Sequence, residues 1–308
     1  MMNDILVDQQ ASWLQSTARQ RLDGLLDAGS FVEFLGPTER IRSPHLRLFD
    51  LPEAFDDGVV IGRGMLAEKP VLIAAQEGQF MGGTFGEISG AKIVGLVRAA
   101  QQNKALPQTV LLLIDSGGVR LQEANAGELA VAELMRAIVQ ARCAGVAVIA
   151  LAGGKSGAFG GAGLTTATCS RVVVSPQGRI GVSGPEVIET NKGVEEYDSR
   201  NKALVWSVCG GKTRRLLGSA DALSEDTMAG FRAAAIEQMK KPPKLDLATL
   251  QAEQTRLQER QDRMGNCDDA VSMWHQLGIA EVASLKDMDT RRFIEVANQT
   301  KEANHDAR

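Results

Sequence analysis

Two pairs of adjacent glycines stand where backbone N–H groups could stabilise a negative charge. Gly117–Gly118 follow the apolar run Val110–Ile114, and Gly160–Gly161 come soon after a second apolar run, Val146–Leu151. Glycine lets a chain turn sharply and lets a ligand approach main-chain N–H groups closely. A helix that starts at such a turn adds unpaired donors and the positive end of its dipole. The two turns therefore fit an oxyanion hole, although the same glycines would also serve tight turns or close packing.

Other residue types with obvious chemistry are scarce and scattered. The chain has three histidines, His45, His275 and His305, and none stands at metal-ligand spacing from another. Its four cysteines are far apart and form no Cys-x-x-Cys motif, so we expect neither a zinc ribbon nor a disulfide framework. The sequence gives no reason to expect a metal in the mechanism.

Alternating strands and helices must position the glycine pairs. Short apolar runs typical of buried strands are separated by stretches with helical periodicity, and this alternation predicts an α/β core. The expected strands are 30–34, 59–66, 70–75, 110–114, 146–151 and 172–175, and the expected helices are 12–27, 87–103, 128–143 and a short one through 168. Residues 40–57 are expected to be irregular, and Glu68-Lys69 is the expected turn of a hairpin.

The sequence changes character past residue 200. Lys241-Pro-Pro-Lys244 is a predicted linker, so we expect one domain at 1–240 and a helical extension at 241–308. In that extension Leu250, Leu257 and Met264 recur every seven residues within a charged helix. Such a stripe indicates docking against this chain or against a partner.

Composition excludes several classes of function. Hydrophobic residues make up 44% of the 308 residues, which is ample for a core, and 34 Lys+Arg against 38 Asp+Glu give a net charge of −4. This balance gives no basic footprint for nucleic acid, and the longest apolar stretch is too short to span a bilayer. No signal-peptide pattern opens the chain. We expect a cytoplasmic enzyme with neither nucleic acid nor membrane as a partner.

Four motifs, in this order, resemble those of acyl-CoA carboxyltransferase subunits. They are Ala18–Glu33, Phe80–Gly86, Asp115–Glu123 and Gly181–Glu189, and the resemblance covers about residues 18–235. With Ala152–Gly163 and Glu186–Tyr197 added, the chain looks most like the β subunit of biotin-independent malonate decarboxylase. It departs from the acetyl-CoA carboxylase β subunit, which carries a four-cysteine zinc ribbon, and it has room for only one of the two halves of single-chain carboxyltransferases.

The resemblance implies a crotonase-like fold, a spiral of β-β-α units, with an N-terminal helix and a C-terminal helical extension. In that fold N–H groups after two strands form the oxyanion hole, and by position these belong to Gly117, Gly118, Gly160 and Gly161. The residues expected around the substrate are Ser116, Arg120, Gln122, Glu123 and Gly184. For Arg120, contact with a substrate anion and an ion pair with Glu123 both stay open. Ser116 is expected to be a helix cap rather than a nucleophile.

The resemblance also implies a carboxy-lyase activity and a set of partners. The substrate would be a malonyl thioester on an acyl carrier protein subunit, attached through a prosthetic group derived from dephospho-CoA. Neither biotin nor a metal would be needed, because backbone N–H groups would stabilise the enolate. A homologous γ subunit would complete the active site, and an acyl-carrier transferase subunit would load the carrier.

Three alternatives remain open at this point. A carboxyltransferase subunit of a biotin-dependent acyl-CoA carboxylase would use the same enolate in the opposite direction. A non-catalytic scaffold would only dock the carrier, and the intact glycine pairs count against it. A crotonase-type hydratase would need two acid/base carboxylates beside the oxyanion hole, and only Glu123 is suitably placed.

Overall fold

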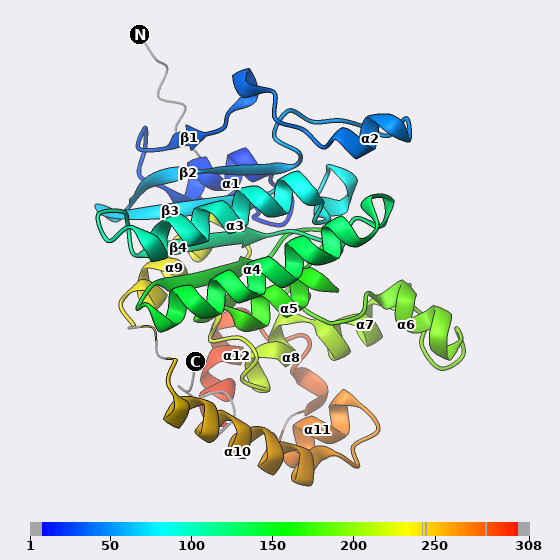
Figure 1. Cartoon of the computed structure of the whole chain (residues 1–308). Coiled ribbons are helices and arrows are strands. Elements are labelled where there is room, and N and C mark those ends of the chain that lie inside the picture. The colour runs from blue at the N-terminus through cyan, green and yellow to red at the C-terminus, as the bar shows by residue number, and fades with distance from the viewer. Residues whose placement is uncertain (1–7, 242, 244, 281, 301–308) are drawn as a thin grey trace.

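A seven-stranded sheet runs through the protein, with its strands in the order in which they occur in the chain. The computed structural model describes residues 8–241, 243, 245–280 and 282–300 (Figure 1). The strands are β1 (Val32–Phe34), β2 (Val59–Leu66), β3 (Lys69–Gln76), β4 (Thr109–Ile114), β5 (Ala147–Ala152), β6 (Arg171–Val174) and β7 (Ala222–Leu223). β1, β2 and β3 pair antiparallel, whereas β3 to β7 pair parallel. The carboxyl ends of the parallel strands therefore lie along one edge.

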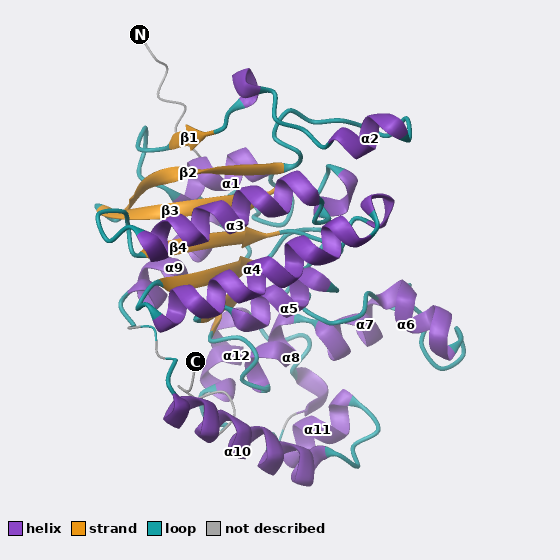
Figure 2. Cartoon of the chain, viewed as in Figure 1, coloured by secondary structure: helices purple, strands orange, loops and turns teal. Residues whose placement is uncertain are grey.

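Helices cover both faces of the sheet (Figure 2). They are α1 (Ala18–Leu25), α2 (Pro44–Leu48), α3 (Glu87–Gln102), α4 (Asn125–Cys143), α5 (Gly161–Thr168), α6 (Pro185–Lys192), α7 (Lys202–Cys209), α8 (Gly211–Leu216), α9 (Met228–Met239), α10 (Leu247–Met264), α11 (Ala270–Gln276) and α12 (Thr290–Ala297). α3 and α4 pack on one face, and α1 and α9 pack on the other.

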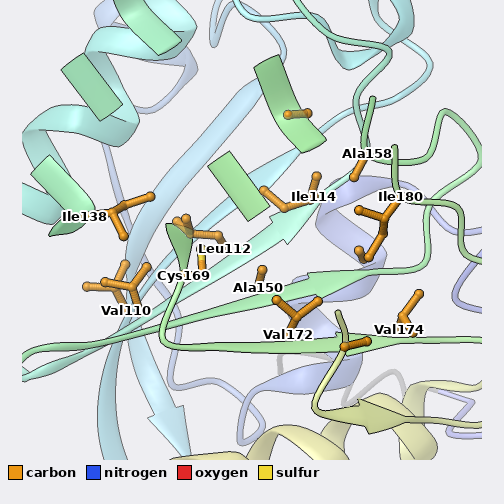
Figure 3. Packing of buried hydrophobic residues seen from close by; sticks show 14 of the residues in the cluster. Val110, Leu112, Ile114, Ile138, Ala150, Ala158, Cys169, Val172, Val174 and Ile180 are labelled. Atoms are coloured by element: carbon orange, nitrogen blue, oxygen red, sulfur yellow. The ribbon is translucent and has the colours of Figure 1, made fainter. Parts of the chain in front are cut away.

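The apolar runs of β4 and β5 fit this arrangement because successive strand residues point to opposite faces. In β4, Leu112 and Ile114 join the cluster under α3 and α4, whereas Leu111 and Leu113 join the cluster under α1 and α9. Figure 3 shows the first of these clusters, in which Ala150 of β5 lies among the side chains of β4 and β6. Both core strands are buried on both faces, as their unbroken hydrophobicity predicts.

A second, shorter layer of strand pairing follows the sheet. Isolated parallel bridges join Phe85 to Val119, Ser116 to Ala158, and Ala158 to Ile180. Each of these segments lies just beyond the carboxyl end of a strand of the main sheet and before the next helix. The chain thus repeats a unit of strand, turn, short second pairing and helix.

The C-terminal helices share the core of the sheet. Trp274, Ile279 and Phe293 belong to the same hydrophobic cluster as the residues under α3 and α4. In α10 only the last residue of the heptad stripe, Met264, is buried, and Leu250 is 53% exposed. The boundary expected at residues 240–241 stays a prediction, and Pro242 and Lys244 of the expected linker lie outside the described residues.

Several expected element boundaries are wrong. The first helix starts at Ala18 rather than residue 12, because Thr17 and Gln20 form a reciprocal capping box. The β2–β3 turn is Ala67-Glu68, both with positive φ, rather than Glu68-Lys69. α4 starts at Asn125, three residues earlier than expected, and the stretch 40–57 contains the short helix α2.

Candidate active site

The two glycine turns meet at the carboxyl edge of the sheet. Gly117–Gly118 follow β4, and Gly160–Gly161 lead into α5 beyond the end of β5. The Ser116 N–H donates to the Gly157 carbonyl at 2.7 Å, and the Phe159 N–H donates to the Ser116 carbonyl at 3.0 Å. Backbone hydrogen bonds therefore join one turn directly to the other.

Gly118 faces the first residues of α5. Its φ of +128° lies in a region that L-residues rarely adopt. A Cβ built on Gly118 would lie 3.3 Å from the Phe159 carbonyl oxygen, 3.6 Å from the Gly160 Cα and 3.8 Å from the Gly161 nitrogen. The position requires glycine both for its backbone angle and for this close approach.

The N–H groups of the four glycines are not equally available. Gly117 donates to the Gly82 carbonyl at 2.9 Å, and Gly160 donates to the Val182 carbonyl at 2.9 Å. Gly118 donates only at 3.2 Å, to the Ser116 hydroxyl, and the Gly161 N–H has no acceptor in the part of the chain that the structure describes. Gly161 is also the first residue of α5, where helix N–H groups are unpaired. The geometry thus favours Gly118 and Gly161 as the donor pair.

Two of the residues expected around the substrate help to shape the turns. Ser116 is fully buried, and its hydroxyl hydrogen-bonds within its own turn, to the N–H and the carbonyl of Gly118. It therefore caps a turn and not a helix. Gly184 is half-buried and precedes α6, two residues after Val182, whose carbonyl accepts from Gly160. The segment that carries Gly184 thus lies against the second turn.

Arg120 lies in a buried ion-pair network. Its guanidinium donates to both carboxylate oxygens of Asp57, at 3.0 and 2.9 Å, and to Glu123 at 2.9 Å. It also donates to the Thr84 carbonyl at 3.2 Å, and the Arg120 side chain is 1% exposed. Of the two roles left open for Arg120, the ion pair with Glu123 is present in the structure. Contact with a substrate stays a prediction.

Burial and hydrogen bonding oppose each other at the two carboxylates of this network. Burial raises the pKa of Glu123, but hydrogen bonds from the Glu87 N–H and the Arg120 guanidinium outweigh it and leave that pKa below its usual value. For Asp57 burial prevails over Arg120, and the pKa of Asp57 is raised. These carboxylates hold the start of α3, since Glu123 accepts from Glu87 and Asp57 accepts from the Ser89 N–H.

Gln122 is exposed, whereas the neighbouring Arg120 and Glu123 are buried. The adjacent Leu121 is 81% exposed, although both Leu121 and Gln122 follow the first glycine turn by only a few residues. Among the side chains expected near the substrate, Gln122 is the exposed one, so it is free to reach a ligand. Its role stays a prediction.

Sequence reasoning missed the buried ion pair behind the turns. Asp115 precedes Ser116 and pairs with Arg21 of α1 at 2.8 Å, and both side chains are almost completely buried. The available signal was an aspartate at the end of an apolar strand, followed by glycines. Its partner, 94 residues earlier, could not be found from spacing alone.

A cavity of about 860 Å³ lies elsewhere, between α7, α8, α11 and α12. Trp206, Trp274 and Phe293 line it, together with Lys212. The Lys212 ammonium donates to the carbonyls of Leu285, Lys286 and Met288. Because no residue of either glycine turn lines this cavity and its lysine is already bound, we place the candidate site at the turns.

The described residues contain neither a metal-ligand cluster nor a membrane-spanning helix. No group of three or more His, Cys, Asp and Glu residues there could hold a metal ion. Nor does that part of the chain contain a helix long and apolar enough to cross a membrane.

Residues 13–210 match the sequence model of the carboxyl transferase domain family. The chain belongs to the carboxyl transferase domain family. It is 40% identical over 246 residues to the malonyl-S-ACP:biotin-protein carboxyltransferase MADC of Malonomonas rubra, covering 76% of this chain and 77% of that protein. It is 31% identical over 189 residues to the methylmalonyl-CoA carboxyltransferase 12S subunit of Propionibacterium freudenreichii subsp. shermanii, covering 61% and 34%.

Solved structures give the same family and the fold. The chain is similar to a chain of a Pseudomonas malonate decarboxylase hetero-tetramer in complex with malonate, with 39% identity and a TM-score of 0.78 over 87% of this chain and 97% of that one. It also matches the transcarboxylase 12S structure at 25% identity and a TM-score of 0.62, over 73% and 41%. The resemblance drawn from the motifs is confirmed, as is the crotonase-like fold.

Proposed function

We propose that this chain decarboxylates a malonyl thioester carried on an acyl carrier protein, releasing CO2 and leaving an acetyl thioester. The close approach of Gly118 to Gly161 at the strand ends carries the proposal, because the backbone N–H groups of these two residues would bind one oxygen atom of the substrate. The similarity to a malonate decarboxylase solved with malonate supports the substrate. The enzyme would be a carboxy-lyase that belongs to the carboxyltransferase family.

The proposed decarboxylation breaks one carbon–carbon bond and consumes one proton. The bond between the malonyl carboxylate carbon and C2 breaks, and its electron pair moves into an enolate whose charge lies on the thioester oxygen. CO2 leaves, and one proton from outside this donor pair adds to C2 to give the acetyl thioester. The N–H groups of Gly118 and Gly161 would hold the enolate oxygen and would bind it more tightly than the neutral carbonyl oxygen.

Backbone N–H donors can stabilise the enolate-like transition state by a catalytically useful amount. One well-aimed N–H donor is worth about 2.7–4 kcal/mol of transition-state stabilisation, or roughly 100- to 1000-fold in rate. Two donors that act on the same oxygen need neither biotin nor a metal to stabilise the enolate. The thioester would enter on an acyl carrier protein through a prosthetic group derived from dephospho-CoA, and an acyl-carrier transferase subunit would load that carrier.

A second, homologous γ subunit would complete the site. Large apolar side chains are exposed on the elements that surround the glycine turns, and a partner subunit would cover them. They include Leu121 after the first turn, Leu129 of α4, Leu164 of α5, and Val182 and Val187 next to and within α6. The similarity to a chain of the Pseudomonas malonate decarboxylase hetero-tetramer supports a partner subunit.

Carboxyl transfer to biotin is the second candidate. It is favoured by the 40% identity to a protein that transfers carboxyl from malonyl-S-ACP to a biotin protein. Both reactions begin with the same cleavage of a malonyl thioester, so the glycine turns serve either one. They differ in whether the carboxyl group leaves as CO2 or is captured by biotin.

The deciding experiment purifies the chain with its associated subunits and supplies malonyl-S-carrier labelled in the free carboxyl group. Release of labelled CO2 in the presence of avidin, with acetyl-carrier as the other product, supports decarboxylation. Label retained on a biotin protein, and loss of turnover with avidin, would replace this proposal with carboxyl transfer. No reaction with malonyl-carrier would reject both.

A further inference from the structure

Asp115 connects the ends of three strands through its carboxylate and its backbone N–H. Its Oδ1 accepts the Ser156 N–H at 2.7 Å, in the loop that follows β5. Its Oδ2 pairs with an Arg21 guanidinium nitrogen at 2.8 Å, and the Arg21 Nε donates to the Trp13 carbonyl at 3.0 Å. The Asp115 N–H points to the Oε1 of Gln76, the last residue of β3.

The surroundings leave this carboxylate almost no freedom. A Cβ added to Gly78 or to Gly154 would collide with the Asp115 carboxyl group, so both loops pass directly against it. The Ser156 hydroxyl also donates to the Gly78 carbonyl at 3.3 Å, which joins the loops after β3 and β5. Asp115 is thus enclosed by two loops, which can pass this close to its carboxyl group because Gly78 and Gly154 have no side chains.

Ser156 lies in the loop that leads into the second glycine turn. Ser156 lies four positions before Gly160, and the carbonyl of the next residue, Gly157, accepts the Ser116 N–H at 2.7 Å. On the other side Asp115 is three residues from Gly118. A bond between the Asp115 side chain and the Ser156 backbone therefore spans the two turns close to both donor glycines.

We propose that Asp115, held by Arg21, is a positioning residue that fixes the second glycine turn against the first and thereby sets the spacing of the Gly118 and Gly161 N–H groups. Its effect on catalysis rests on the proposed function, whereas its effect on the geometry of the turns does not. Arg21 also neutralises the charge of the Asp115 carboxylate. Without this pairing, a buried negative charge close to the donors would repel the negative charge on a bound oxygen.

The test compares Asp115→Asn with a matched control, Asp27→Asn. The amide of Asp115→Asn keeps an oxygen for the Ser156 N–H but loses the charge that holds Arg21. Asp27 makes the same kinds of contact with a more exposed side chain (26%), since it pairs with Arg232 and accepts the N–H groups of Ala67 and Glu68 at 3.0 and 2.8 Å. It lies at the β2–β3 turn, at the opposite end of the sheet. Arg21→Lys, which keeps the charge, is the milder second variant in case Asp115→Asn does not fold.

The first readout does not depend on the reaction. Amide hydrogen exchange, followed by mass spectrometry on the protein with its associated subunits, measures local opening. We expect peptides covering 115–120 and 156–163 to exchange faster in Asp115→Asn and in Arg21→Lys, and at the wild-type rate in Asp27→Asn. Unchanged exchange at both turns in the two test variants would overturn the proposal, whatever reaction the protein catalyses.

The second readout is steady-state turnover of malonyl-carrier. Small displacements of a catalytic group cost up to about 100-fold in rate, so we expect kcat of Asp115→Asn to fall about 10- to 100-fold with KM within about twofold. Asp27→Asn should lose thermal stability but keep kcat. A wild-type kcat in Asp115→Asn would overturn the positioning role, whereas an inactive wild type combined with the expected exchange would reject the proposed function alone.

Discussion

Replacing Gly118 with alanine should separate catalysis from folding. The new Cβ would lie 3.3 Å from the Phe159 carbonyl oxygen and 3.8 Å from the nitrogen of the second donor, Gly161. The φ of +128° is also unfavourable for alanine, at a cost of about 1–3 kcal/mol. We expect the turn to relieve this strain by rotating the Gly118 peptide, which moves its N–H away from a bound oxygen.

The expected magnitude follows from the loss of one donor. One misdirected N–H should lower kcat by roughly 100- to 1000-fold, or about 2.7–4 kcal/mol. The assay is CO2 release from malonyl-carrier by the assembled protein, with circular dichroism and Tm as measures of folding. The strain alone should lower Tm by roughly 2–4 °C for each kcal/mol.

Gly145→Ala is the matched control for this strain. Gly145 also has a positive φ, +82°, but an added Cβ would meet nothing within 4 Å, and the residue lies at the opposite end of β5. This variant should lose stability and keep its turnover. If Gly118→Ala folds, loses no more stability than Gly145→Ala and retains kcat within about threefold, the assignment of Gly118 as an oxyanion donor is refuted.

Three further predictions concern the metal, the partner and the buried network. Dialysis against EDTA should leave decarboxylation unchanged, because backbone donors stabilise the enolate; zinc- or magnesium-dependent recovery of lost activity would contradict this. The chain alone should be inactive and gain full turnover when mixed with its partner subunit, and turnover by the separate chain would show a self-contained site. The lowered pKa of Glu123 means that its stabilisation is complete above its unfolded pKa and disappears as the pH falls through its folded pKa. Glu123→Gln should therefore cost about 3 kcal/mol near neutral pH and flatten the acid side of a plot of Tm against pH, and an unchanged acid side would exclude this role.

Sequence alone predicted the strands that carry the turns because their hydrophobicity is unbroken. Val110–Ile114 lies within β4, and Val146–Leu151 overlaps β5 to within one residue at each end. The local hydrophobic pattern predicted the first residues of helices less well, because a single capping side chain can determine where a helix begins. Thr17 starts α1 through its capping box, whereas the residues before it pack in turns, with Trp13 stacked on Phe231 at 4.2 Å.

The sequence predicted the positions of the glycine turns but not the hydrogen-bond and ion-pair partners around them. Adjacent glycines after a buried strand are visible in the sequence, but which N–H remains available depends on carbonyls far along the chain. Gly82 lies 35 residues before its donor Gly117, and Val182 lies 22 residues after its donor Gly160. Arg120 donates to both carboxylate oxygens of Asp57, a residue 63 positions earlier in the chain. This contact could not be inferred from the expected pair with Glu123.

The polar side chains near the turns are used to hold the backbone in place. Asp115 binds the loop after β5, Ser116 caps its own turn, and Glu123 binds the start of α3. Arg120 and Glu123 are saturated mainly by each other and by Asp57, so a proton moved by either would break a buried ion pair. An enolate formed here would therefore take its proton from water, from the exposed Gln122 region or from another subunit. A site that supplies fixed N–H donors without a mobile acid is suited to cleaving the malonyl thioester. The fate of the carboxyl group, as free CO2 or on biotin, would then be decided by the surface that covers it.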